Sequence, residues 1–351
     1  MNNPVVNKYT KNQIIEIYKN IENTNRFILL RGPIGVGKTL IAKILSKMII
    51  DKDFDYQNIK LDDEKWDELV DFNKDKGCNE KFSKQVSVVP FHPGSDYENL
   101  IYGLKLKTIN GNLEYNATER ILLNVISKAK KAKEENTDKR YVVILDDVNR
   151  GNFSRAMGDI LSAVESKDIG NAVRTPEENY TIPDNFYLIA TFNPTIANPN
   201  IDYAWLRRFM IFDIFSDERY IDNVNDIIER NKVKFFNETD KRNFFSETDK
   251  EKFTDYIYEL YMQMKIMFER YFLDDDVNII KQYMPGHGLF MTYDKNEDYA
   301  KKFSYQLKHC IVPLLYQYVK DGLLDQRALI DIKAYEHLYD ENFKECWKDG
   351  D

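Results

Sequence analysis

The chain has 351 residues, of which 43% are hydrophobic and 31% charged, and its formal net charge is -8. This composition predicts a folded protein with room for two packed units and argues against disorder. The acidic balance argues against a surface devoted to nucleic acid, because neutralising phosphates needs clustered Lys and Arg, but it leaves a local basic channel open.

Neither a membrane segment nor a disulfide framework is indicated. No apolar stretch approaches the roughly 18 residues that a spanning helix needs, and the N-terminus lacks the regions of a signal peptide. The cysteines, Cys78, Cys310 and Cys346, are far apart and odd in number, which suggests neither paired bridges nor a zinc spacing. We therefore expect a cytoplasmic protein without membrane attachment.

The first elements in chain order are an amphipathic helix and a strand. Ile14, Ile17 and Ile21 recur at helical spacing within residues 1–24, and the apolar run Phe27–Leu30 is typical of a buried strand. Residues 32–39 then read Gly-Pro-Ile-Gly-Val-Gly-Lys-Thr, which fills every fixed position of the phosphate-binding pattern G-x-x-x-x-G-K-[ST]. Placed between a strand and an amphipathic helix, this run predicts a loop that binds a nucleoside triphosphate.

Each residue type in this loop has a chemical reason. Backbone N–H groups and the N-terminus of the following helix favour phosphate, Lys38 can reach the β and γ phosphates, and Thr39 can hold Mg²⁺. The alternative is a glycine-rich helix cap without a ligand. The residues predicted to bind the nucleotide are Gly32, Pro33, Ile34, Gly35, Val36, Gly37, Lys38, Thr39 and Leu40.

The middle of the chain alternates strand and helix patterns. An acidic, lysine-rich insert near residues 51–84 is expected to be a solvated excursion, and a hairpin is expected over 102–115 around Asn110-Gly111, ahead of a helix over 119–133. The remaining strands are predicted at 86–91, 141–145, 186–191 and 209–214. Strands alternating with helices predict an α/β fold with a five-stranded parallel sheet covered on both faces.

From about Ser216 the pattern becomes helical, with long stretches at 251–272 and 298–321 and no clear strand. The aromatic residues between Tyr256 and Phe272 follow helical spacing, which favours core packing over base stacking. A short duplication, 235–241 and 244–250, is interpreted as a surface feature. The expected organisation is an N-terminal helix at 1–24, a nucleotide-binding core at 25–216, and a helical lid and C-terminal domain at 217–351.

Polar residues after three of the strands are the candidates for chemistry. Asp146 follows an apolar strand, as the Mg²⁺-binding carboxylate of such sites does, and Asp147 would orient or activate the attacking water. Asn193 could hold the same water against the γ-phosphate. A helix cap and an ordinary Asn-Pro turn are the respective alternatives. Arg207 and Arg208, before the last strand, either form a surface ion-pair cluster or reach a neighbouring subunit's site.

The order of these motifs resembles the AAA+ class of ring-forming NTPases, and particular residues resemble its McrB family, the motor subunit of McrBC-type restriction systems. That family usually has Glu at the position of Asp147, and Met-Asn-Thr where this chain has Phe192-Asn193-Pro194. The residues that carry the likeness include Phe91, His92, Pro93, Asp146, Asn149, Arg150, Asn185, Asp202, Tyr203, Arg207, Arg208, Phe209, Gly286, His287, Leu289 and Phe290.

The resemblance implies a Mg²⁺-dependent NTPase that forms a homo-oligomeric ring, a hexamer by analogy, and drives or regulates an McrC-like endonuclease subunit. GTP is implied by resemblance and ATP stays open, while DNA would be reached through the complex. Cleavage would be supplied in trans, because no nuclease motif is visible in this chain. The alternative is a MoxR-like ATPase that remodels protein complexes. A nucleotide switch with weak turnover is the third reading, which Asp147 favours.

Overall fold

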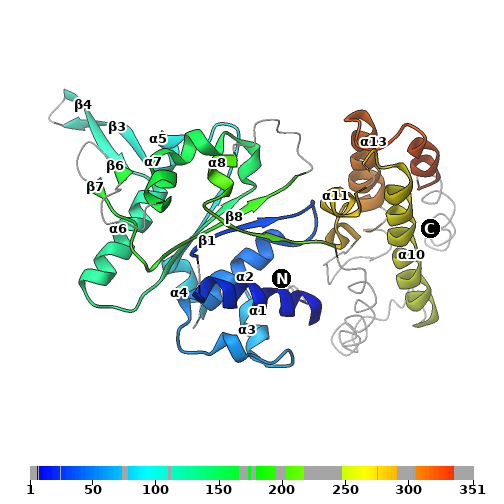
Figure 1. Ribbon diagram of the computed structural model, residues 1–351, viewed down its shortest axis with the longest axis horizontal. Coiled ribbons are helices and arrows are strands. Elements are labelled where there is room, and N and C mark those ends of the chain that lie inside the picture. The colour runs from blue at the N-terminus through cyan, green and yellow to red at the C-terminus, as the bar shows by residue number, and fades with distance from the viewer. Residues whose placement is uncertain are drawn as a thin grey trace, which may run out of the picture. The chain divides into compact units, whose positions relative to one another are not determined.

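The structure is a computed structural model. It describes residues 6, 8–23, 25–72, 78–109, 112–165, 173–174, 179–194, 203–216, 247–274, 276–290, 303 and 305–335. The chain divides into two compact units (Figure 1): one comprises Lys8–Gly32 and Lys38–Ile214, and the other comprises Met1–Asn7, Pro33–Gly37 and Phe215–Asp351. We call the first the sheet unit and the second the helical unit.

The sheet unit is built on five parallel strands in the order β2-β5-β8-β1-β9. All five lie where the apolar runs predicted them, and strand β8 is buried along its whole length. A strand buried on both faces needs apolar residues throughout, which is why these strands appear in the sequence as continuous runs. Their bounds are Phe27–Arg31 (β1), Val86–Pro90 (β2), Tyr141–Asp146 (β5), Phe186–Phe192 (β8) and Met210–Asp213 (β9).

Helices cover both faces of this sheet (Figure 1). Alternate strand residues, such as Leu29, Val143 and Leu188, pack in one core with α6 (Ile121–Glu134) and α7 (Phe153–Glu165). The amphipathic helix α1 and the phosphate-loop helix α2 lie together on the other side. Their bounds are Lys8–Asn23 (α1) and Lys38–Ile50 (α2), and short helices follow at Tyr97–Leu100 (α5), Val148–Arg150 (η2) and Tyr203–Leu206 (α8).

The predicted hairpin is present and longer than expected. Strands β3 (Tyr102–Ile109) and β4 (Asn112–Glu119) pair antiparallel, with Ile109 opposite Asn112. The two residues between them, Asn110 and Gly111, lie outside the described residues. A second small ribbon pairs β6 (Val173–Arg174) with β7 (Asn179–Tyr180).

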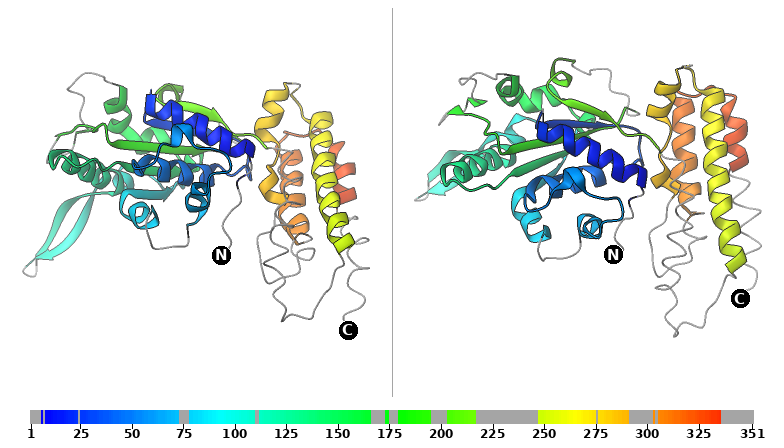
Figure 2. Two further views of the ribbon diagram at one scale, coloured as in Figure 1. Left: turned by 90° about the horizontal axis from the view of Figure 1, so that it is seen from below. Right: turned by 60° about the horizontal axis from the view of Figure 1, so that its bottom comes forward.

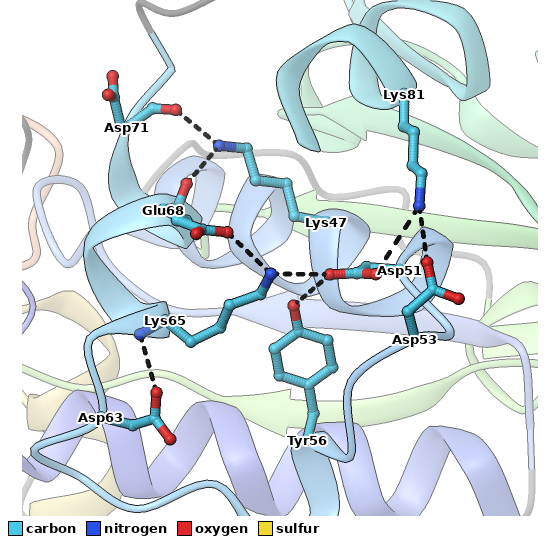
Figure 3. Close-up of polar contacts among 9 residues, drawn as sticks. All are labelled: Lys47, Asp51, Asp53, Tyr56, Asp63, Lys65, Glu68, Asp71 and Lys81. Carbon is cyan, nitrogen blue, oxygen red and sulfur yellow. Dashed lines mark hydrogen bonds and ion pairs between the residues drawn. The ribbon is translucent and has the colours of Figure 1, made fainter. Parts of the chain in front are cut away.

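The insert after α2 is not the solvated excursion expected from its charged composition. Its α3 (Lys65–Val70) and α4 (Cys78–Gln85) pack against α2, and its η1 (Tyr56–Asn58) packs against α1, with Tyr56 and Trp66 buried. Figure 3 shows the reason: the charges bond to one another and to backbone carbonyls. Asp51 accepts from the Tyr56 hydroxyl at 2.9 Å and pairs with Lys65 at 3.2 Å. Asp51 is therefore buried within the insert and compensated there, while most of the insert's other charged side chains remain exposed.

The helical unit has its own apolar core, to which Tyr261, Met264 and Phe268 contribute, as the aromatic pattern predicted. Figure 2 shows α10 alongside the segment that ends in α13. Pro313 lies in the first turn of α13, after one turn of π-helix over Leu307–Ile311. The bounds are Glu247–Tyr271 (α10), Val277–Tyr283 (α11), His287–Phe290 (η3) and Val312–Lys320 (α13).

Two expected features fall partly or wholly outside the described residues. The duplication at 235–241 lies outside them, and of its second copy only the backbone from Glu247 onward is described, as the start of α10. Among the described residues, no helix combines the length and apolarity needed to cross a membrane.

Candidate nucleotide site

Gly32 at the start of the phosphate loop, Asp146 and Asn193 meet at one edge of the sheet. They follow the carboxyl ends of β1, β5 and β8, which are consecutive in the strand order and parallel. After β1 the chain crosses to β2 at the far edge, and it returns to the other side of β1 only with β9. Ligands of open α/β sheets bind outside the carboxyl ends at such a change of direction.

The phosphate loop has the backbone that its glycines predict. Gly35 and Gly37 have φ values of 83° and 85°, a region that residues with a Cβ rarely adopt. The Gly32 N–H donates to the Phe192 carbonyl at 3.1 Å, which ties the start of the loop to the end of β8. Within the helical unit, Gly286 and Gly288 donate their N–H groups to the carbonyls of Ile34 and Gly35 at 2.7 and 2.9 Å.

Lys38, at the first position of α2, is buried and curled back onto the loop. Its Nζ donates to the Gly32 carbonyl at 2.8 Å. Burial lowers the pKa of Lys38 to about 8, and the charges of Asp147 and Asp146 oppose this shift. A cation held at this energetic cost is suited to a polyanionic ligand, because added phosphate charge would restore its ordinary pKa.

Two hydroxyl groups converge on the carboxylate of Asp146. Thr39 Oγ1 donates to Asp146 Oδ1 at 2.8 Å, and Thr191 Oγ1 donates to the same oxygen at 2.7 Å. The residues predicted to hold Mg²⁺, Thr39 and Asp146, are therefore in direct contact although 107 positions separate them. A hydroxyl and a carboxylate next to a phosphate loop are the oxygen ligands that Mg²⁺ takes in such sites.

Asp147 leaves the strand in a left-handed conformation, with φ 57° and ψ 52°. Its backbone N–H donates to Thr191 Oγ1 at 2.8 Å, and its carboxylate pairs with Arg150 at 2.9 Å. Both side chains of the ion pair remain partly exposed. Asp147 therefore stands beside Asp146, and its carboxylate is paired with Arg150.

Asn149 and Asn193 are joined by two hydrogen bonds. Asn149 Nδ2 donates to the Asn193 carbonyl at 2.8 Å, and the Asn193 N–H donates to Asn149 Oδ1 at 2.9 Å. Both residues are buried. The amide of Asn149 thus ties the turn that carries Asn193 to the turn that carries Asp147.

Arg207 and Arg208 are not at this edge. They precede β9, and because all strands are parallel they lie toward the amino ends, opposite the phosphate loop. Asn25, which precedes β1, donates from Nδ2 to the Arg208 carbonyl at 3.0 Å. This hydrogen bond also places Arg208 at the amino end of β1. Arg207 is exposed. Within one chain, the two arginines are therefore separated from the predicted catalytic residues by the length of the sheet.

The histidines singled out by the sequence have structural contacts. His92 Nδ1 accepts from the Gly94 N–H at 3.1 Å, and the His287 N–H donates to Ser216 Oγ at 3.1 Å. In the described part of the chain, no group of three or more His, Cys, Asp or Glu side chains could hold a metal ion.

Comparison with known proteins gives a relative that matches about half of the chain. No protein-family model matches the chain. It is 27% identical over 195 residues to the type IV methyl-directed restriction enzyme EcoKMcrB subunit of Escherichia coli K12. Over these residues the chain is therefore similar to an McrB subunit. The alignment covers 53% of this chain and only 35% of the length of that relative.

Several solved structures align loosely with this chain. They are NtrX from Brucella abortus (TM-score 0.37, 12% identity, 64% of this chain and 40% of that one), a putative ATPase from Cytophaga hutchinsonii (0.34, 15%, 74% and 63%) and Hsp104 with ATPγS and casein (0.34, 13%, 70% and 40%). At TM-scores below 0.5 these similarities carry no argument about this chain.

Sequence reasoning overlooked Thr191 and the contact that Asn149 makes. Thr191 is a polar residue in the apolar run of β8, two positions before Asn193, the first residue after the strand. A polar residue so close to a predicted site residue was the signal in the sequence that could have indicated Thr191. The partners of Thr191 and Asn149 could not be read from sequence, because they depend on the register between β5 and β8 and on the turns that follow these strands.

Proposed function

We propose that this chain hydrolyses a nucleoside triphosphate with Mg²⁺ as part of a homo-oligomeric ring, and that the ring drives or regulates an endonuclease subunit of the McrC kind. GTP is the first candidate substrate because of the resemblance to McrB, and ATP is the second. DNA would be reached through the complex, in the cytoplasm, as part of restriction and antiviral defence. The relative's description as a restriction subunit favours this over remodelling of protein complexes.

The observation that carries the proposal is the contact between Thr39 and Asp146 beside the buried Lys38. These three side chains supply the cation and the oxygen ligands that a triphosphate with its Mg²⁺ requires. The bound ion would neutralise charge on the phosphates. Lys38 and the N–H groups of the loop would hold the phosphates themselves.

The remaining residues have roles that follow from their places. Asp147 would orient the attacking water, and Asn193, held by Asn149, would contact the same water from the end of β8. Arg207 and Arg208 lie toward the opposite edge of the sheet, so we assign them to the site of the next subunit in the ring, where they would stabilise charge in the transition state.

Hydrolysis of ATP and of GTP by the purified chain, with Mg²⁺ and with EDTA, tests the activity. We expect Mg²⁺-dependent phosphate release that is lost in Lys38→Ala and reduced in Asp147→Asn. Equal rates in the parent chain and in Lys38→Ala would refute the proposal. Co-purification of a nuclease subunit with the chain in a slowly hydrolysed nucleotide tests the partner separately.

Mixing of variants tests the arrangement between subunits. Arg207→Ala and Asp146→Asn should each be inactive alone, since the first lacks the donated arginine and the second lacks the metal ligand. A mixed ring contains sites with an intact Asp146 that face an intact Arg207. Activity should therefore reappear on mixing. Two inactive variants that stay inactive in a demonstrably mixed ring would show that Arg207 does not act across subunits.

A further inference from the structure

Thr191 forms a hydrogen-bonded bridge between two consecutive residues of the candidate site. It is fully buried in β8. Its hydroxyl donates to Asp146 Oδ1 at 2.7 Å and accepts from the Asp147 N–H at 2.8 Å. A threonine hydroxyl has one hydrogen to donate, so this geometry commits it to the carboxylate.

Packing alone does not explain why a threonine occupies this buried position. Valine has nearly the same shape and suits a buried strand better, because it brings no polar atom into the core. The hydroxyl contributes what valine cannot, which is control over Asp146 and an acceptor for the Asp147 N–H. That acceptor is needed where the chain turns into the left-handed conformation of Asp147.

We propose that Thr191 is a positioning residue that aims the Asp146 carboxylate at the metal and fixes the peptide that presents Asp147. The inference rests on the proposed NTPase function. Thr39 and Thr191 both bond Oδ1, so the carboxylate is fixed through one oxygen by groups from α2 and β8. Partners that orient a metal ligand in this way typically affect metal affinity or activity about 10- to 100-fold.

Two substitutions separate the hydroxyl from the shape of the side chain. Thr191→Val removes the hydroxyl and keeps the volume, whereas Thr191→Ser keeps the hydroxyl and removes a methyl group. Ser46→Ala is the matched control, because Ser46 is also fully buried and its hydroxyl bonds the Ala42 carbonyl within α2, outside the proposed site. Each variant is compared with the parent in steady-state hydrolysis across Mg²⁺ concentrations.

For Thr191→Val we expect kcat to fall about 10- to 100-fold and the Mg²⁺ concentration at half-maximal rate to rise. Binding of a fluorescent nucleotide analogue in EDTA should stay at the parent value, because the phosphate loop is intact. The gain in affinity that Mg²⁺ gives the parent should shrink. Thr191→Ser should retain most of the activity, and Ser46→Ala should keep the parent's Mg²⁺ dependence.

The inference is overturned if Thr191→Val keeps the parent's kcat and Mg²⁺ dependence, or if Thr191→Ser loses as much as Thr191→Val does. A Thr191→Val protein whose only change is a lower melting temperature, as in Ser46→Ala, also overturns it. A parent chain without hydrolysis or Mg²⁺-dependent binding would instead refute the proposed function, and the two failures are therefore distinguishable.

Discussion

Helix α2 buries a lysine at each end, and the two lysines have different surroundings. Lys38, at the N-terminal end, is 7% exposed, donates to the Gly32 carbonyl, and has a pKa lowered to about 8 by burial. Lys47, near the C-terminal end, is completely buried. It donates to the carbonyls of Glu68 and Asp71 at 3.0 and 2.7 Å.

The groups around each lysine distinguish a buried charge that stabilises the fold from one that is suited to binding a ligand. Lys47 bonds carbonyls at and just beyond the C-terminus of α3, where a cation is favoured, and it lies over the ring of Phe72 at 4.1 Å. Its surroundings compensate for its burial. Lys38 sits at a helix N-terminus, where a cation is disfavoured and an anion is favoured. Under the proposed function, phosphate would complete that end of the helix.

The largest expected effect is on hydrolysis by Lys38→Met. Removing the cation should reduce kcat/KM about 10²- to 10³-fold, as loss of one electrostatic contact to a transition state does. The melting temperature should stay equal or rise, because a buried charge at the unfavourable end of a helix is gone. Phosphate release and differential scanning fluorimetry on the same preparation check both. If activity falls only in proportion to the folded fraction, Lys38 stabilises the fold rather than binding the nucleotide.

Lys47→Met, the same substitution at the other end of α2, should do the reverse. Two carbonyls lose their donor, which should lower the free energy of unfolding by about 2–4 kcal/mol. Hydrolysis per folded molecule should stay at the parent value. Urea unfolding followed by tryptophan fluorescence is a suitable measurement, because Trp66 is buried in α3 beside this contact. Unchanged stability would show that Lys47 is not needed to hold the insert.

The lowered pKa of Lys38 gives opposite pH trends for binding and for stability. The folded chain releases this proton near pH 8 and the unfolded chain near 10.5, so between these values the unfolded state binds more protons and stability rises with pH. Bound phosphates hold the proton on Lys38. Nucleotide affinity should therefore fall as pH rises above 8, by up to about tenfold per unit. Phosphate groups ionise near pH 6 and do not contribute there.

Calorimetry in two buffers of different ionisation enthalpy measures this coupling directly. At pH 8.5 the parent chain should take up a fraction of a proton on binding the nucleotide. Lys38→Met should take up none, and its stability should lack the rise above pH 8. Equal proton uptake in the parent and in Lys38→Met would assign the titration to another group.

Much of the fold could be predicted because it is encoded locally. The five buried strands are apolar runs, and the phosphate loop is one continuous motif, so Lys38 and Thr39 needed no knowledge of the tertiary structure. Asp146 could be predicted because parallel strands bring their carboxyl ends to one edge. The contact between Thr39 and Asp146 follows from the same rule.

The packing of the insert at 51–84 and the contacts of Thr191 could not be predicted, because they depend on residues distant in the sequence. Charged composition usually marks a solvated segment. Only the tertiary contacts show that Asp51 is buried beside Lys65, and that Lys47 of α2 is buried against the carbonyls of the insert. Thr191 was one polar residue in an apolar strand, and its two bonds depend on the pairing of β5 with β8. In both places, function or stability depends on polar partners distant in sequence.

The smallest expected effect concerns the ring of Phe72, which lies against the Lys47 ammonium group. Phe72→Leu keeps an apolar side chain and removes the aromatic face below Lys47, which should lower the free energy of unfolding by about 1 kcal/mol. In a double-mutant cycle with Lys47→Met, the two effects should be coupled by about 0.5–1 kcal/mol, because the cation and the ring stabilise each other. Additive effects would show that the carbonyls of Glu68 and Asp71 alone compensate the buried charge.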